Sequence, residues 1–318
     1  MHTTNQEISE SQQRILQKLE REMGEIVLGA LRDDEVLEIM LNPDGRLWED
    51  RFSTGMQVIG EMTAVRAENL MGTIANALGE PWSKANPIVE GELPTDGSRF
   101  EGVLPPVVDR PTFAIRKKAT KIFTFADYVK AGIMTIEQRD ILLGHIRAKH
   151  NILVAGGTGS GKTTLCNAIL HAIAEIHPEA RMVIIEDTRE LQCPIANKVM
   201  LRTSDTIDMT RLLKVTLRLR PDGIGLGEVR DKAALAMVKA WNTGHGLGVC
   251  TTHANTAESA LTRIENLVQE AGVPPNRAVI AEAINCVVSI QKTKEGRRID
   301  GICTVKGATE SGYELVFH

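Results

Sequence analysis

Residues 156–163 read Gly156-Gly157-Thr158-Gly159-Ser160-Gly161-Lys162-Thr163, close to the middle of the 318-residue chain. This stretch matches G-x-x-x-x-G-K-[ST], the pattern of a phosphate-binding loop. The apolar run 151–155 before it predicts a strand, and the residues from Lys162 to about Glu175 have the periodicity of a helix. Because the pattern is functional between a strand and a helix, we expect residues 156–163 to bind phosphate groups.

The residue types in this loop suit ATP with Mg²⁺. Glycines let successive backbone N–H groups turn toward a phosphate, and the start of the following helix adds its positive end. Lys162 is expected to reach the β- and γ-phosphate oxygens, and Thr163 to hold Mg²⁺. The predicted nucleotide-binding residues are Gly156, Gly157, Thr158, Gly159, Ser160, Gly161, Lys162, Thr163 and Thr164.

Short apolar segments recur after the loop, at 182–185, 224–227 and 247–251, with helical patterns such as 233–241 between them. Strands that alternate with helices predict a parallel sheet covered on both faces. The chain from residue 136 to residue 318 is therefore expected to be an α/β domain.

Acidic residues follow two of these predicted strands. Glu186 and Asp187 end the strand at 182–185, and Glu228 closes the segment 224–230. Ligands of open α/β sheets bind at the carboxyl ends of the strands, and phosphoryl transfer needs acidic groups that place metal and water. We expect Glu186 and Glu228 to be catalytic and Glu228 to share Mg²⁺ with Thr163. Which carboxylate acts as the base stays open.

Two histidines flank the predicted strand at 247–251. His253 lies just past its end and is a candidate sensor of the γ-phosphate. His245 precedes the strand, and a structural role is as good an explanation for it as a functional one. Neither histidine has a cysteine or carboxylate at metal-ligand spacing, so zinc binding is not expected.

The first half of the chain predicts a smaller α+β domain. An amphipathic helix is expected from about Ser9 to Leu31, then a hairpin with strands at 36–41 and 47–49, a helix at 64–78, and an irregular small sheet within 91–116. The helix is expected to pack on its own domain, with a membrane surface as the alternative. The predicted domains are 1–125 and 136–318, with a linker at 126–135.

Composition limits the classes of function. The net charge of -4, the pI near 6.1 and the 3% of aromatic residues give no concentrated basic or stacking surface, so direct binding of nucleic acid is not expected. No uncharged apolar run approaches the roughly 20 residues that span a bilayer, and the start does not resemble a signal peptide. A cytoplasmic protein is expected, and peripheral association with the inner membrane stays open.

The cysteines are five in number, widely separated and without a CxxC pair, which favours small buried core residues over a zinc or redox site. They are Cys166, Cys193, Cys250, Cys286 and Cys303.

Four segments taken in order resemble the four sequence boxes of the bacterial type II/IV secretion ATPases. They are the loop 156–163, the acidic segment 185–191, the segment 220–230 and the histidine segment 245–253. The resemblance covers about residues 36–305 and is greatest to the conjugation branch. The chain lacks the four-cysteine zinc segment found in many type II relatives. It also has no aspartate in the strand before Glu228.

The resemblance implies a RecA-like C-terminal domain, a smaller N-terminal α+β domain, and ATP enclosed between them. It implies a homohexamer that powers a type IV secretion or conjugative DNA-transfer apparatus, with inner-membrane components of that apparatus as partners. In this family Lys162 and Thr163 match the Walker A box, Glu186 the Asp box, Glu228 the Walker B box and His253 the His box. Segments 96–100 and 115–117 resemble the family's arginine segments, which implies that Arg99 and Arg116 reach the phosphates.

Other functions share part of this pattern. A type IV pilus or type II secretion motor has the same boxes, and a RecA-type DNA translocase predicts basic pore loops, for which the cluster 292–298 is a candidate that a hairpin turn explains equally well. A GTPase is disfavoured because Asn197-Lys198-Val199-Met200 lacks the aspartate that would bind guanine. A non-catalytic scaffold is disfavoured by the joint presence of Lys162, Glu186 and Glu228.

Overall fold

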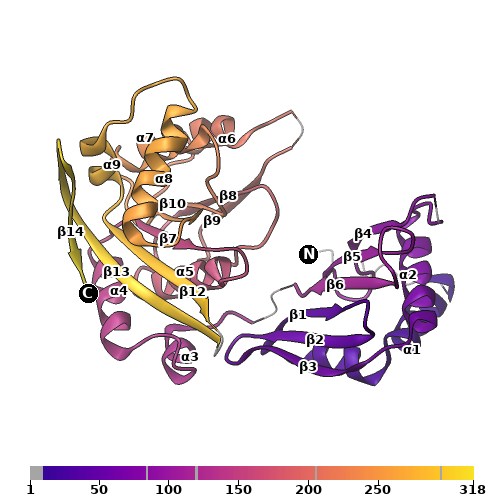
Figure 1. Ribbon diagram of the computed structural model, residues 1–318. Helices are drawn as coiled ribbons and strands as arrows, with labels where there is room; N and C mark the ends of the chain where they lie inside the picture. Colours follow the sequence, from indigo (N-terminus) through magenta and orange to yellow (C-terminus); the bar gives the residue numbers. More distant parts are fainter. Residues whose placement is uncertain (1–9, 84, 119–120, 205, 294–295) are drawn as a thin grey trace. The chain divides into compact units, whose positions relative to one another are not determined.

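The chain divides into two compact units, Met1–Lys121 and Ile122–His318 (Figure 1). The computed structural model describes residues 10–83, 85–118, 121–204, 206–293 and 296–318. Each unit has its own sheet and its own cluster of buried apolar side chains.

The first unit is built on an antiparallel sheet of six strands in the order β3-β2-β1-β6-β5-β4. Its strands are β1 (Val36–Leu41), β2 (Arg46–Arg51), β3 (Gly55–Glu61), β4 (Ile88–Glu92), β5 (Arg99–Val103) and β6 (Thr112–Arg116). The segment 91–116, expected as an irregular small sheet, instead completes this regular sheet, because β6 pairs with β1 of the first hairpin.

Two helices, α1 (Glu10–Arg32) and α2 (Ala64–Leu78), pack on this sheet. Leu19, Met23 and Val27 of α1 are buried in the unit's core, so the amphipathic helix packs on its own unit as predicted. The predicted start at Ser9 lies outside the described residues.

The first helix is not regular, because Gly24 has a φ of 72° and interrupts it. The Arg66 guanidinium of α2 donates hydrogen bonds to the carbonyls of Glu22 and Arg21 at 2.7 and 2.8 Å. A Cβ at Gly24 would lie 2.2 Å from that guanidinium, so the break depends on glycine. Periodicity alone predicted one continuous helix.

The second unit has an eight-stranded sheet in the order β14-β13-β12-β7-β11-β10-β8-β9. Six strands are parallel: β12 (Cys286–Thr293), β7 (Ile152–Gly156), β11 (Val249–His253), β10 (Gly223–Leu226), β8 (Met182–Glu186) and β9 (Lys198–Arg202). The last two strands, β13 (Gly296–Thr309) and β14 (Gly312–Phe317), are antiparallel. The predicted parallel sheet thus carries two further antiparallel strands at this edge, because connections as short as those between β12, β13 and β14 allow only antiparallel pairing.

Helices form two groups around this sheet. The first comprises α3 (Phe125–Lys130), α4 (Ile136–Arg147) and α5 (Lys162–Ile176), and the second comprises α6 (Met209–Thr216), α7 (Ala233–Trp241), α8 (Ala257–Gln269) and α9 (Arg277–Ala283). All of β7 is buried, and only Leu153 and Ala155 belong to the cluster with α6–α9. Both faces of the sheet are therefore covered, and the predicted α/β class is confirmed.

The span expected as a linker, 126–135, mostly forms α3 and the turn after it. Thr124 and Asp127 form a capping box at the start of α3, and Tyr128 is fully buried. The structure places the boundary between the units at Lys121, several residues earlier. A helix of six residues is too short for its periodicity to be recognised in the sequence.

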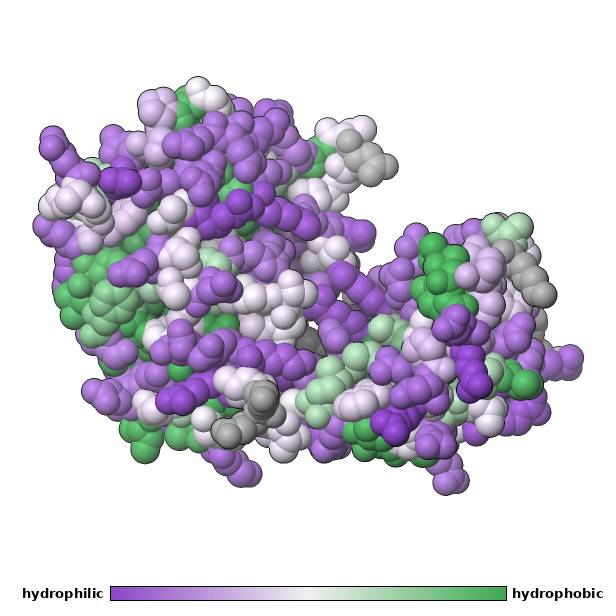
Figure 2. All heavy atoms as spheres, in the orientation of Figure 1, coloured by the Kyte–Doolittle hydropathy of each residue, from purple (hydrophilic) through white to green (hydrophobic). Residues whose placement is uncertain are grey.

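Apolar residues on the face in Figure 2 occur as separate groups among hydrophilic side chains. Over the described chain as a whole, the exposed large apolar residues include Val65 and Ile26 in the first unit and Ile136 in the second. Within the described residues, no helix is long and apolar enough to cross a membrane. The five cysteines are buried, as predicted.

Candidate active site

The glycine-rich loop joins the buried strand β7 to the start of α5, as the sequence predicted. Gly159 and Gly161 have φ values of 68° and 95°, a region that side chains with a Cβ rarely adopt. These turns and the start of α5 bring backbone N–H groups to the same place, which is the geometry of an anion-binding loop. Thr158 is exposed within the loop, and Thr164 lies in the first turn of α5.

The Lys162 ammonium lies over this loop. It is 8% exposed, and its Nζ donates to the carbonyl of Gly157 at 2.9 Å. The Ser160 hydroxyl donates to the same carbonyl, also at 2.9 Å. The positive charge is thus held at the centre of the loop, where a phosphate bound to the backbone amides would meet it.

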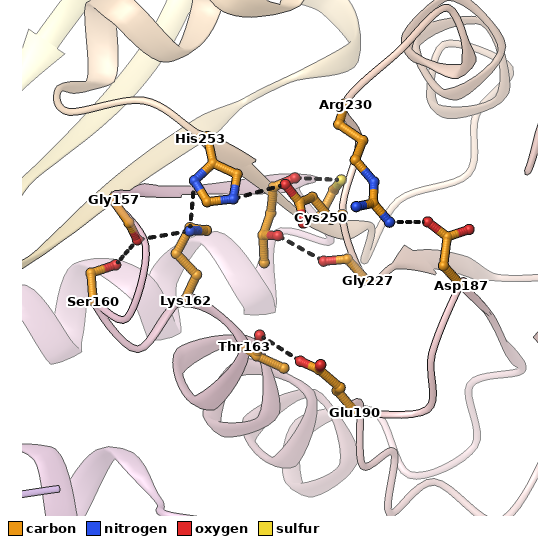
Figure 3. A network of polar contacts seen from close by, with 12 residues as sticks. Gly157, Ser160, Lys162, Thr163, Asp187, Glu190, Gly227, Arg230, Cys250 and His253 are labelled. Carbon is orange, nitrogen blue, oxygen red and sulfur yellow. Dashed lines mark hydrogen bonds and ion pairs between the residues drawn. The ribbon is translucent and has the colours of Figure 1, made fainter. Parts of the chain in front are cut away.

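His253 lies between Lys162 and Glu228, and Figure 3 shows its contact with Lys162. Its Nδ1 lies 3.4 Å from Lys162 Nζ, and its Nε2 lies 3.0 Å from Glu228 Oε1. Because an ammonium can only donate, Nδ1 is the acceptor of the first contact, and the Nε2–H donates to the Glu228 carboxylate. Three of the predicted site residues thus form one chain of polar contacts.

Thr163 faces a carboxylate that the sequence did not single out. Its hydroxyl donates to Glu190 Oε2 at 3.3 Å, and Figure 3 shows these two side chains meeting at the start of α5. Mg²⁺ prefers oxygen ligands and usually takes only one or two from protein, the others coming from phosphates and water. The Thr163 hydroxyl and the Glu190 carboxylate fit that chemistry.

Glu186 ends β8 but lies beneath the loop that follows it. It is 2% exposed, and its Oε1 accepts the backbone N–H groups of Glu190 and Leu191 at 2.9 and 2.7 Å. Burial raises the pKa of this carboxyl group, and the two backbone hydrogen bonds oppose that rise. Glu186 therefore holds the loop that carries Glu190, while its own catalytic role stays a prediction.

The rest of the acidic loop is also fixed by polar contacts. Asn167 of α5 donates to the Glu190 carbonyl at 3.3 Å and accepts from the Gln192 N–H at 2.8 Å. Asp187 accepts from the Thr203 hydroxyl at 2.9 Å and pairs with Arg230, which follows Glu228 by two residues. The loops after β8 and β10 are thereby joined.

Arg99 and Arg116 belong to the first unit. They are paired residues on β5 and β6, so the structure places the two predicted arginines next to each other. Arg116 is half exposed, with its Nε 3.9 Å from Glu38 Oε1. Their predicted contact with phosphates stays a prediction.

A further cation at the loop was missed from the sequence. Arg297 of β13 is 7% exposed, and its Nη2 donates to the Gly159 carbonyl at 3.4 Å. It lies in the basic cluster 292–298, whose residues 294–295 are outside the described chain. No local pattern separates Arg297 from its basic neighbours, because only the pairing of β12 with β7 brings this hairpin to the loop.

The chain is similar in sequence to known proteins. Residues 61–306 match the family described as Type II/IV secretion system protein. The chain is 50% identical over 305 residues to a protein of Sinorhizobium fredii named as conjugal transfer protein TrbB, which covers 96% of this chain and 94% of that one. It is 30% identical to the type IV secretion system protein VirB11 of Bartonella henselae, over 76% of this chain and 78% of the relative.

A solved structure shows the same fold. The ATPase DotB of Legionella pneumophila superposes with a TM-score of 0.58 at 16% identity, over 94% of this chain and 81% of that one. Because the family model matches residues 61–306 and a relative is 50% identical over 96% of the chain, the chain belongs to the type II/IV secretion system protein family of nucleoside-triphosphate-hydrolysing enzymes.

Proposed function

We propose that this chain hydrolyses ATP with Mg²⁺ to power a conjugative type IV secretion apparatus. The observation that carries the proposal is the polar chain from Lys162 through His253 to Glu228 at the mouth of a phosphate-binding loop. It links the group that binds phosphate to a carboxylate that can accept a proton.

Each residue has a defined task in this proposal. The loop amides and Lys162 bind the phosphate oxygens, and Glu228 orients the attacking water and takes its proton. His253 holds the Glu228 carboxylate and senses charge at Lys162. Thr163 and Glu190 hold Mg²⁺, which supplies positive charge for the phosphates.

Arg99 and Arg116 are proposed to contact the nucleotide phosphates, an assignment that rests on the family resemblance. Arginines placed on the γ-phosphate raise the rate by roughly 10³ to 10⁵ in other phosphoryl-transfer enzymes. In Arg99→Ala and Arg116→Ala, the rate of ATP hydrolysis should therefore fall by a large factor, while the free energy of unfolding falls much less. Normal rates in both variants would remove these residues from the mechanism.

The proposed apparatus follows from the relatives. A TrbB conjugal transfer protein and a VirB11 type IV secretion protein are both similar to this chain over three quarters of its length or more. We propose that the chain acts as a homohexamer at the inner membrane, where its partners are components of the transfer apparatus. Domain movements driven by hydrolysis would transmit force to those components.

The enzymatic part is tested with purified protein. Lys162→Ala should lose nearly all release of phosphate from ATP, whereas Lys239→Ala, which removes an exposed lysine on α7, should retain it. Circular dichroism would show that both variants are folded. Full turnover by Lys162→Ala would contradict the assignment of the loop.

The cellular part is tested by plasmid transfer. Donor cells without this chain should lose conjugation, and the wild-type gene but not Lys162→Ala should restore it. Undiminished transfer from the deletion strain would exclude the conjugative role and leave the ATPase assignment standing.

A further inference from the structure

A cavity of about 510 Å³ opens beside the first half of the phosphate-binding loop. One wall consists of residues 156–158 and 253–255, and helix α8 supplies the other. The residues of α8 that line it are Ser259, Thr262, Arg263 and Asn266. None of them belongs to the four boxes by which the family resemblance was identified.

These four residues form one polar stripe of the helix. Their spacing of three, four and seven residues from Ser259 puts them on the same face. The opposite face carries Ala260, Leu261 and Ile264 into the core of the unit. Because the apolar face of α8 packs in the core, its polar stripe is left to line the cavity beside the loop.

The cavity lining contains a basic side chain and no acidic one. It includes the guanidinium of Arg263 and the imidazole of His253. The buried acidic residue of α8, Glu265, is not in the lining and accepts a hydrogen bond from Arg277 at 3.0 Å. An anion in the cavity would meet the Arg263 guanidinium and no carboxylate of the lining, while the Glu228 carboxylate contacts the His253 imidazole at 3.0 Å.

Two lining hydroxyls are already engaged within the helix. Ser259 Oγ donates to the Thr256 carbonyl at 3.0 Å, and Thr262 Oγ1 donates to the Glu258 carbonyl at 3.2 Å. Throughout the described ranges, by contrast, no hydrogen bond or ion pair joins the side chain of Arg263, Asn266 or Asn255 to another residue. The donors left for a ligand are therefore one guanidinium and two amides.

We propose that Arg263 binds a phosphate group in this cavity, next to Lys162 and on the His253 side of the loop. The proposal rests on the function proposed above and adds to it a phosphate-binding residue from α8. A planar guanidinium with several N–H donors matches phosphate oxygens, and the amides of Asn255 and Asn266 complete the set. The phosphate is either the terminal group of bound ATP or the inorganic phosphate released from it.

Equilibrium binding separates these sources. The dissociation constants of ADP and of a nonhydrolysable ATP analogue, both with Mg²⁺, are measured for the wild type, Arg263→Ala and Arg263→Lys. If Arg263 contacts the terminal phosphate, Arg263→Ala raises the dissociation constant of the analogue about tenfold or more, while that of ADP changes by less than about twofold. Arg263→Lys keeps the charge and should restore part of the loss.

A second arm measures inhibition of ATP hydrolysis by added inorganic phosphate. If the cavity receives only released inorganic phosphate, Arg263→Ala leaves the dissociation constant of the analogue unchanged and raises the inhibition constant of phosphate about tenfold. Arg147→Ala is the matched control, because Arg147 is exposed at the end of α4, where the Ile146 carbonyl lies 2.9 Å from His177 at the far end of α5. Neither arm should change in that control.

Equal weakening of ADP and the analogue would show that Arg263 only supports the fold, and unchanged values in both arms would show that it binds no phosphate. Either result overturns the inference. If the wild type binds and hydrolyses ATP and Arg263→Ala behaves identically, only the role of Arg263 is refuted. A wild-type chain that binds no nucleotide would instead refute the proposed function.

Discussion

Two glutamates follow neighbouring parallel strands at one edge of the second unit, and their partners differ. Strands β8 and β10 pair along four residues, and Glu186 ends the first while Glu228 follows the second by two residues. Glu186 is almost fully buried and accepts two backbone N–H groups. Glu228 keeps 26% of its side-chain surface and faces the imidazole of His253.

The difference shows that a place at a strand end does not define a catalytic carboxylate. Backbone donors fix Glu186 in a position closed to water, so its carboxylate stabilises a loop. Glu228 contacts His253 and still keeps part of its side-chain surface exposed, so its carboxylate can orient water and accept a proton. The two side chains should therefore respond differently to the same substitution.

The largest expected effect is on turnover. Glu228→Gln removes the proton acceptor at unchanged size and should lower kcat by about 100-fold or more. Glu186→Gln keeps an oxygen that can accept the two backbone hydrogen bonds and should lower kcat by less than about tenfold. Steady-state phosphate release at saturating Mg²⁺ and ATP measures both. The reverse order would make Glu186 the base.

The second effect is on stability and has the opposite order. Glu186→Ala leaves the buried N–H groups of Glu190 and Leu191 without their acceptor and should lower the free energy of unfolding by about 2 kcal/mol. Glu228→Ala removes a partly exposed contact and should change it by less than about 1 kcal/mol. Urea unfolding of the full chain gives both values. Equal losses would mean that the loop after β8 does not depend on Glu186.

The third effect concerns Glu190, which Glu186 holds in place beside Thr163. Glu190→Gln removes the negative charge near the Thr163 hydroxyl and should raise the Mg²⁺ concentration for half-maximal activity by about tenfold. Glu179→Gln, at a side chain that is 72% exposed, is the control and should leave it unchanged. A Glu190→Gln variant with the wild-type Mg²⁺ requirement would favour the metal ligands predicted from the sequence, Thr163 and Glu228.

Much of this site could be predicted from the sequence because its parts follow local rules. The loop 156–163 has a fixed spelling, and a parallel sheet brings the ends of its strands to one edge, so His253 and Glu228 were expected near Lys162. Their direct contact agrees with that expectation. These predictions needed only the order of strands and loops.

The parts that were not predicted depend on contacts between distant segments. Glu190 reaches Thr163 only because Glu186 and Asn167 fix the loop between them, and Arg297 reaches Gly159 only through the pairing of β12 with β7. The break at Gly24 likewise depends on Arg66 from another helix. Such contacts leave no periodic pattern in the sequence around either partner.

The smallest expected effect is a pH dependence, and it isolates the burial of Glu186. Burial raises the pKa of this carboxyl group above its ordinary value of 4.5, so the folded chain holds the proton more tightly than the unfolded chain does. As the pH rises through 4.5, the unfolded chain ionises first, and Glu186 makes folding progressively less favourable until the folded carboxyl is ionised too.

Glu186→Gln cannot ionise and escapes this loss. Its free energy of unfolding, measured against the wild type by urea titration at a series of pH values, should therefore improve relative to the wild type as the pH rises above 4.5 and become constant at higher pH. Glu270→Gln, at an exposed residue after α8, removes one charge from the surface and corrects for the change in net charge. A relative loss for Glu186→Gln with rising pH would show that the hydrogen bonds from Glu190 and Leu191 outweigh burial. The carboxylate beneath the loop would then be stabilised in its charged form, and the contrast with Glu228 would rest on accessibility alone.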